Sequence, residues 1–213
     1  MGIVGVVRSF APHAGKPGTY HLIVDGQEPL DVHEDVIVAL ELRVGLAVTP
    51  ELWQAILAQQ ELAQVRRAAL RLLEVRDRSR RDLRTALIKR KHRAEAIEQV
   101  LDRLESLGLM NDDAYARNLA EGLMRRQGVG RRGLKHKLMQ GGVSQELAKS
   151  VVEEAFEGVD EVQQAVAALE KRLARWTNLP VEKRRMRAYA YLARLGFGGD
   201  VISDALHRAL ADE

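Results

Sequence analysis

Clusters of Lys and Arg are the residues in this sequence whose chemistry stands out. Residues 66–95 hold twelve basic and four acidic side chains, residues 125–137 hold six basic and none acidic, and residues 170–187 hold seven basic and two acidic. Acid-rich stretches, 98–121 and 146–161, separate them. A basic cluster with few compensating acids binds a phosphate backbone or an acidic protein surface, unless it is simply a solvated helix face. Charge alone does not distinguish these partners.

The candidate partner-binding and DNA-binding residues are basic side chains that recur at corresponding places in the chain. Many of them flank apolar residues at helical spacing, which places the charges on the outer side of a helix. The candidates are Arg80, Arg81, Arg84, Lys89, Arg90, Lys91, Arg125, Arg126, Arg131, Arg132, Lys135, Lys137, Lys183, Arg184, Arg185 and Arg187.

Other residue types offer no recognisable reaction chemistry. Gly128–Gly133 spells G-x-G-x-x-G, but a helix is expected before it rather than the strand of a dinucleotide site, so an interhelical turn is predicted. The six histidines share no ligand spacing, and cysteine is absent. We therefore expect no metal site, no cofactor and no catalytic residues. Trp53 and Trp176 are both expected to pack inside helical faces, and stacking on a base stays open as an alternative for Trp176.

Composition indicates a folded, mainly helical protein of the cytoplasm. Of 213 residues, 46% are hydrophobic, 30% are charged and 4% are aromatic. The low aromatic content disfavours a β-sandwich, and the absence of cysteine fits a reducing compartment. No secretion signal and no membrane-spanning run is recognisable.

An internal repeat organises most of the chain. A shift of 51 residues aligns residues 65–101 with residues 116–152 without a gap, and a third, more divergent copy follows at a shift of about 50 to 54. Each copy predicts three helices, with Ser79 and either Asn111 or Asp112 as N-caps and Gly108 as a left-handed C-cap. Such units bury little apolar area alone and must stack on one another. We expect a mainly α fold of three tandem three-helix repeats in an elongated, curved body.

The first part of the chain has a different pattern. Short β-rich runs surround Asp25-Gly26, a hairpin-type dipeptide, and Thr49-Pro50 is a strong helix start that leads into residues 52–63. A short helix is expected around residues 35–42. The predicted organisation is a small α+β extension with a β-hairpin (1–62) and helical repeats at 63–110, 111–158 and 159–213.

Five motifs follow one another within residues 63–210: Ala69-Leu70-x-Leu72-Leu73, Leu107-Gly108-Leu109, Asp112-Asp113-x-Tyr115-Ala116, Gly130-Arg131-Arg132-x-Leu134 and Leu192-Ala193-Arg194-Leu195-Gly196-Phe197. In this order they resemble the RecX family of regulatory proteins. The sequence departs from the family pattern mainly around Thr177–Val181.

The resemblance implies a cytoplasmic, non-enzymatic modulator of the RecA recombinase. Such proteins bind within the groove of the RecA–DNA filament and restrain its ATP hydrolysis, strand exchange and coprotease activity. The expected partners are RecA on DNA and the phosphate backbone, with no membrane, and the protein is expected to act as a monomer. Two alternatives stay open: a DNA-binding protein that acts without RecA, and a helical adaptor that uses the acidic third helices.

Overall fold

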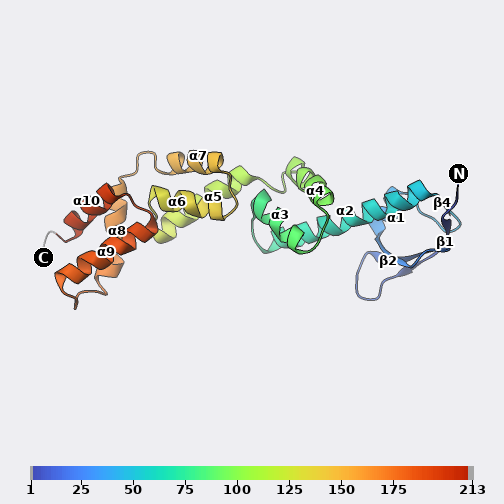
Figure 1. Cartoon of the computed structure of the whole chain (residues 1–213), viewed down its shortest axis with the longest axis horizontal. Helices are drawn as coiled ribbons and strands as arrows, with labels where there is room; N and C mark the ends of the chain where they lie inside the picture. Colours follow the sequence, from blue (N-terminus) through green and yellow to red (C-terminus); the bar gives the residue numbers. More distant parts are fainter. Residues whose placement is uncertain (1, 211–213) are drawn as a thin grey trace. The chain divides into compact units, whose positions relative to one another are not determined.

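The N-terminal residues form a four-stranded antiparallel sheet. A computed structural model of the protein describes residues 2–210, without the side chains of Gln127 and Lys171 (Figure 1). The strands are β1 (Gly5–Pro12), β2 (Thr19–Val24), β3 (Leu30–His33) and β4 (Ala47–Val48), in the order β3-β2-β1-β4. The hairpin between β2 and β3 is confirmed, and Gly26 adopts the left-handed conformation in its turn, with φ of 73°. The two-residue β4 was not predicted.

The chain divides into two compact units, which are described separately. The first unit contains the residues up to Arg76 together with Leu83–Leu109, and the second contains Asp77–Asp82 together with the chain from Met110. Among residues 2–210, no helix is long and apolar enough to cross a membrane.

The core of the first unit starts on one face of the sheet. Leu22 and Val24 of β2 are buried, whereas His21 and Ile23, which alternate with them, are on the opposite face. The buried cluster consists of Val7, Leu22, Val24, Val32, Leu42, Val48 and Ile56. Trp53 packs against this cluster, as predicted.

Four helices complete or border the first unit: α1 (Glu34–Ala39), α2 (Pro50–Val75), α3 (Arg80–Lys89) and α4 (Ala94–Ser106). The hydroxyl of Thr49 accepts a hydrogen bond from the amide of Leu52 at 3.2 Å, which confirms the predicted cap of α2. The expected boundary between residues 62 and 63 lies inside α2, which is continuous. The physical reason is that Leu62-Ala63-Gln64-Val65 contains no glycine or proline to end a helix.

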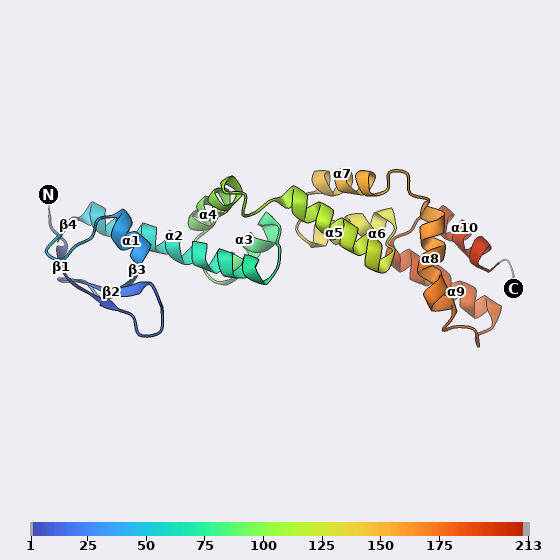
Figure 2. The same ribbon diagram turned by 180° about the vertical axis from the view of Figure 1, so that it is seen from behind.

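The second unit contains two complete three-helix repeats, which confirms the predicted fold class. Its helices are α5 (Asp112–Gln127), α6 (Arg131–Gln140), α7 (Gln145–Ala155), α8 (Glu161–Leu173), α9 (Val181–Leu195) and α10 (Gly199–Ala209). In the second repeat, α7 packs against α5 and α6 (Figures 1 and 2). In the third, α8, α9 and α10 contact one another pairwise. The residues that distinguish the third repeat, Thr177–Pro180, fall in the loop between α8 and α9.

Within this unit, a recurring joint connects the first residues of α3 to the end of α6, and the first residues of α6 to the end of α9. At one joint, the buried hydroxyl of Ser79 accepts a hydrogen bond from the amide of Asp82 at 3.2 Å and donates one to the carbonyl of Gly141 at 2.7 Å. The first bond is the predicted cap of α3. At the other joint, the amide of Gly130 donates to the carbonyl of Leu195 at 3.0 Å. In each case the N-terminus of one helix meets the C-terminus of the next, which aligns their dipoles favourably.

The G-x-G-x-x-G segment serves this joint, as the predicted interhelical turn. Gly128 is the left-handed C-cap of α5. A Cβ atom at Gly130 would lie 2.6 Å from the carbonyl oxygen of Gly196, and one at Gly133 would lie 2.0 Å from that of Leu195. Glycine is therefore required by the close approach of two backbones.

Candidate nucleic-acid and partner interface

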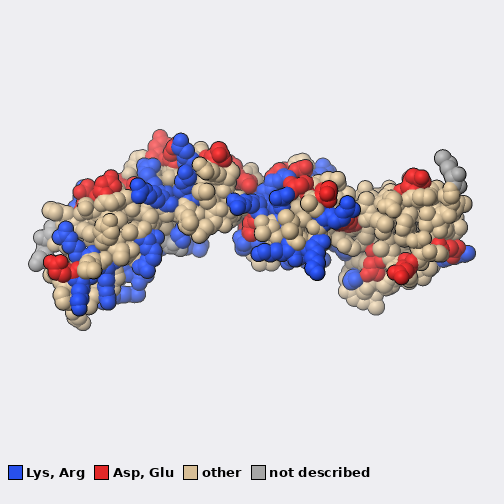
Figure 3. Space-filling model, viewed as in Figure 1, with Lys and Arg blue, Asp and Glu red and all other residues tan. Residues whose placement is uncertain are grey.

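The second helices of the three repeats are α3, α6 and α9, and their apolar residues fix which sides carry the charges. Leu83 and Leu87 of α3, Leu134 and Leu138 of α6, and Leu192 of α9 are fully buried. All sixteen basic candidates are exposed or half-buried. On the face shown in Figure 3, Lys and Arg gather over the helical repeats, whereas the sheet region is mostly uncharged with scattered acids. This distribution agrees with the net negative charge of residues 1–50.

Some of the candidate arginines have partners within the chain. Arg131 pairs with Glu161 at 3.3 Å and lies over the ring of Phe156, with 4.8 Å between its guanidinium carbon and the ring centroid. Arg84 bonds to Glu98 at 2.5 Å. Arg80, Arg81 and Arg184 also take part in interactions within the chain. These five side chains contribute to the scaffold.

The backbone amides at two of these positions, Arg80 and Arg131, are capped in the same way. The backbone amide of Arg80 donates to the carboxylate of Asp112 at 2.7 Å, and that of Arg131 donates to Glu161 at 3.2 Å. In both cases an acid at the start of a repeat's first helix caps the second helix of the preceding repeat. Such caps satisfy amides at the helix start and place negative charge at the positive end of the dipole.

The remaining candidates keep their charge available to a partner. Within the part of the chain that the structure describes, eleven of them make no ion pair with an acidic residue: Lys89, Arg90, Lys91, Arg125, Arg126, Arg132, Lys135, Lys137, Lys183, Arg185 and Arg187. Eight of the eleven belong to the second unit, on α5, α6 and α9.

A basic cavity of about 680 Å³ lies between α5, α8 and α9 in that unit. Arg125 and Arg126 line it from the end of α5, and Arg172 and Arg175 line it from α8 and the residues that follow. Glu170 is the one acid among its lining residues. Sequence reasoning missed Arg172 and Arg175 as site residues, although both belong to the third basic cluster.

An aromatic residue forms one wall of this cavity. The guanidinium carbon of Arg172 lies 5.1 Å from the ring centroid of Tyr191, and that of Arg194 lies 6.0 Å from it. Trp176 meets Tyr191 edge to face at 6.5 Å and packs against the core of the third repeat. Tyr191 is thus an aromatic lining residue that two arginines and one tryptophan contact.

One polar atom of a residue that lines the cavity lacks a partner. The amide oxygen of Gln164 is buried without a hydrogen bond to any described residue, while its nitrogen contacts the sulfur of Met124 at 3.5 Å. A buried acceptor without a partner is unfavourable unless water or a ligand supplies a donor. The cavity thus combines cations suited to phosphate with an aromatic lining residue.

A second basic hollow, of about 500 Å³, lies between α6 and α9. Arg132 and His136 line it from α6, and Tyr189 and Arg194 line it from α9. Tyr189 is half exposed, at 50%. Its lining residues include no acid. Arginine and tyrosine together again favour contact with phosphates and bases.

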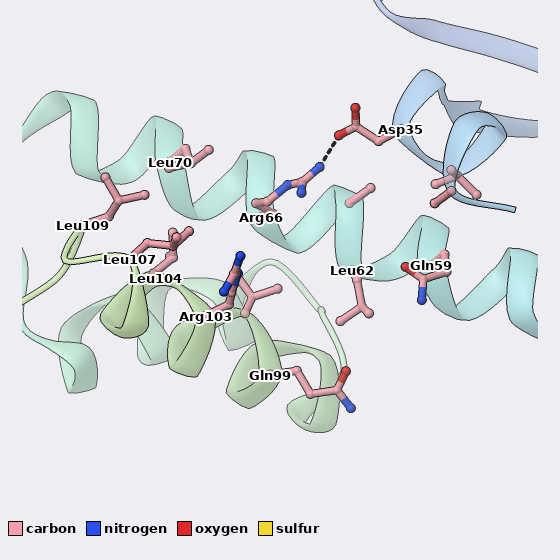
Figure 4. Close-up of a pocket in the computed structure, with 14 residues that line it drawn as sticks. Asp35, Gln59, Leu62, Arg66, Leu70, Gln99, Arg103, Leu104, Leu107 and Leu109 are labelled. Atoms are coloured by element: carbon pink, nitrogen blue, oxygen red, sulfur yellow. Dashed lines mark hydrogen bonds and ion pairs between the residues drawn. The ribbon is translucent and has the colours of Figure 1, made fainter.

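The first unit holds an apolar groove instead. It has a volume of about 550 Å³, and leucines of α2 and α4 line it, including Leu62, Leu70 and Leu104 (Figure 4). Arg66 pairs with Asp35 at its edge (Figure 4). None of the eleven candidate basic residues without an ion pair lines this groove.

Comparisons with known proteins place these features in a family. Three stretches match the three domains of RecX in order: residues 66–104 the first three-helix domain, residues 111–152 the second and residues 159–206 the third. Each stretch falls inside one of the three repeats expected from the sequence.

Individual relatives agree with this match. The regulatory protein RecX of Streptomyces coelicolor is 34% identical over 150 residues, which cover 70% of this chain and 79% of that protein. RecX of Deinococcus radiodurans is 37% identical over 139 residues, covering 65% and 64%. A crystal structure of regulatory protein RecX covers 98% of this chain and 100% of its own, with a TM-score of 0.71 at 21% identity. That of RecX from Lactobacillus salivarius covers 71% and 97%, with a TM-score of 0.60 at 21% identity. The chain belongs to the RecX family of regulatory proteins.

Proposed function

We propose that this protein binds the RecA–DNA filament in the bacterial cytoplasm and restrains its ATP hydrolysis, strand exchange and coprotease activity. The observation that carries the proposal is the set of unpaired basic side chains on α5, α6 and α9, in a chain of the RecX family. The chain acts as a monomer and needs no cofactor, because the ATP chemistry belongs to RecA.

The charge distribution supports a partner that presents rows of anionic groups. Cations on successive second helices contact successive phosphates, or acids on successive RecA subunits, whereas a compact anion would use only one repeat. Phosphate contacts position a protein without reading sequence, which fits a regulator that must act on filaments of any DNA sequence.

Charge reversal of unpaired residues tests the proposal with the least damage to the fold. The double change Arg132→Glu and Lys135→Glu leaves the observed ion pairs intact. Changing Arg81 or Arg84 would also disturb contacts within the chain, so these positions are less suitable. We expect the double variant to lose inhibition of the DNA-dependent ATPase of RecA while its circular dichroism spectrum stays unchanged.

A matched control keeps the change in net charge the same. Arg43 lies outside the basic clusters, and Lys149 lies on α7 among acids. The pair Arg43→Glu and Lys149→Glu should inhibit RecA like the unmodified protein. Full inhibition by the Arg132/Lys135 variant, or an equal loss in the control, would refute the assignment to this surface.

Direct binding to DNA without RecA is the second candidate, because the basic cavity beside Tyr191 offers both cations and a stacking surface. Affinity for bare single-stranded DNA should then fall with salt, with a log–log slope of about 0.7 per phosphate neutralised. Arg125→Glu with Arg126→Glu should reduce that slope by about 1 or more. If bare DNA binds as tightly as the RecA filament does, the direct mode is favoured. A filament preference that survives this change favours RecA as the partner.

A further inference from the structure

We propose that His13, His21 and Asp31 form a binding site for a divalent transition-metal ion on the N-terminal sheet. One potential ligand atom from each of the three side chains lies within 4.8 Å of the other two. Sequence spacing did not reveal this group, and the expectation that the histidines form no metal site is revised here. The inference is independent of the proposed action on RecA.

Strand pairing creates the site. His21 of β2 is the direct cross-strand partner of Asp31 of β3, and such partners on one face have Cβ atoms about 5 Å apart. His13 follows β1, and its amide donates to the carbonyl of Thr19 at 2.9 Å, so the pairing of β1 with β2 continues to this residue. Thr19 and His21 are two positions apart in β2, so their side chains lie on the same face of the sheet, and this places His13, His21 and Asp31 on that face together. That face is opposite to the one that buries Leu22.

The distances are close to those of a metal centre. His21 Nδ1 lies 2.7 Å from one carboxylate oxygen of Asp31, and His13 Nε2 lies 3.5 Å from the other. Ligands about 2.0–2.1 Å from a tetrahedral zinc ion are about 3.3 Å from each other. Coordination of one ion would require His21 Nδ1 and the Asp31 oxygen to separate by about half an ångström, and the two histidine nitrogens lie within 4.8 Å of each other.

The hydrogen bonding of the cluster is incomplete without a further group. The ring of His13 stacks near that of His21, with 4.6 Å between their centroids, yet His13 Nδ1 is buried without a hydrogen-bond partner among the described residues. Buried polar atoms in folded proteins nearly always have a partner. Coordination of either ring nitrogen would fix the tautomer and orientation of this imidazole.

Lys16 would compete with the ion for the carboxylate of Asp31. Its ammonium lies 2.8 Å from Asp31 Oδ2, and the hydrogen bond from Lys16 is the main reason that the pKa of Asp31 lies below its usual value. The Lys16 side chain is 55% exposed, so it can swing into water when an ion arrives.

The ligand set selects the class of ion. Two imidazole nitrogens and one carboxylate oxygen favour Zn²⁺ and its neighbours in the transition series over Mg²⁺ and Ca²⁺, which prefer oxygen ligands alone. Three protein ligands leave one position of a tetrahedral ion to water. The ion would tie the loop that follows β1 to β2 and β3.

Calorimetric titration of Zn²⁺ into the full, untagged, chelator-treated chain tests the site. We expect one saturable site near neutral pH. His21→Ala or Asp31→Ala should weaken the affinity about tenfold or more, since each removes a direct ligand. Lys16→Met should instead tighten binding by about two- to fivefold, because it removes an exposed competing ion pair. His136→Ala, an exposed histidine elsewhere, is the matched control and should bind Zn²⁺ normally.

A spectroscopic readout keeps the test independent of fold stability. Co²⁺ in place of Zn²⁺ should give the visible absorption of a nitrogen- and oxygen-ligated ion in the unmodified chain and in Lys16→Met, and lose it in His13→Ala. Absence of saturable binding in the unmodified chain, or equal affinity in the His21→Ala and His136→Ala variants, would overturn the proposal. A variant whose circular dichroism matches the unmodified protein and which no longer binds supports it.

Discussion

Replacement of Gly133 by alanine tests the joint between the second and third repeats. An added Cβ atom would lie 2.0 Å from the carbonyl oxygen of Leu195 and 2.8 Å from its carbonyl carbon. A carbon–oxygen contact normally spans more than 3 Å, so the two backbones must separate by about 1 Å. Neither partner is a side chain that can rotate away. The start of α6 must therefore move from the end of α9.

The magnitude follows from two opposing terms. Overpacking costs about 1–3 kcal/mol, and a contact between two backbones belongs at the upper end of that range. Alanine in a helix gains about 1 kcal/mol over glycine. The expected net loss in the free energy of unfolding is about 2 kcal/mol. Urea unfolding followed by far-UV circular dichroism measures it.

Gly122 of α5 provides the matched control. An added Cβ atom there would meet no other atom within 4 Å. Gly122→Ala should therefore raise the free energy of unfolding by about 0.5–1 kcal/mol, since only the helix preference changes. If Gly133→Ala is as stable as Gly122→Ala, the two backbones do not approach closely and the joint has been assigned incorrectly.

Further perturbations follow from other contacts. Ser79→Ala removes the buried donor to the carbonyl of Gly141 and should lower the free energy of unfolding by about 1–3 kcal/mol, measured in urea. Leu134→Ala empties a fully buried position of α6 and should cost about 2–5 kcal/mol by the same assay, whereas a loss below 1 kcal/mol would mean that the second repeat is loosely packed. Hydrogen bonds from its own amide and from Thr49 lower the pKa of Glu51, so its contribution is present at neutral pH and is lost as the pH falls through that lowered pKa. Glu51→Gln should accordingly make the melting temperature less dependent on pH in the acidic range, and an unchanged pH dependence would contradict the cap.

Much of the helical architecture could be predicted from local sequence patterns. Thr49, Asn111 and Gly108 act as the caps that their residue types predict, because a cap depends on a few neighbouring backbone groups. The repeat itself was visible because equivalent helices need equivalent apolar spacing. The sequence did not predict that one helix runs through the boundary expected between residues 62 and 63. A helix can pack against two different groups of residues along its length without any change in local helix propensity.

The local sequence pattern does not predict which residues of the basic clusters form ion pairs within the chain. The sequence identified Arg131 and Arg132 as equivalent candidates. In the structure, Arg131 forms an ion pair with Glu161 and lies over the ring of Phe156, whereas Arg132 makes no ion pair with a described residue. Adjacent residues on a helix point about 100° apart, so neighbours in sequence meet different surroundings. Which of the two arginines forms an ion pair within the chain depends on where the following repeat packs.

The sequence by itself determined the helices, their caps, the three-fold repetition and the places where positive charge accumulates, because these depend on residues a few positions apart. Only the tertiary structure decided which charges stay available and which distant residues meet. Arg126 joins Arg172 because α5 packs beside α8 and α9, and His13 joins Asp31 because two strand pairings lie between them. Such encounters are set by register and packing across the chain, which no local pattern records.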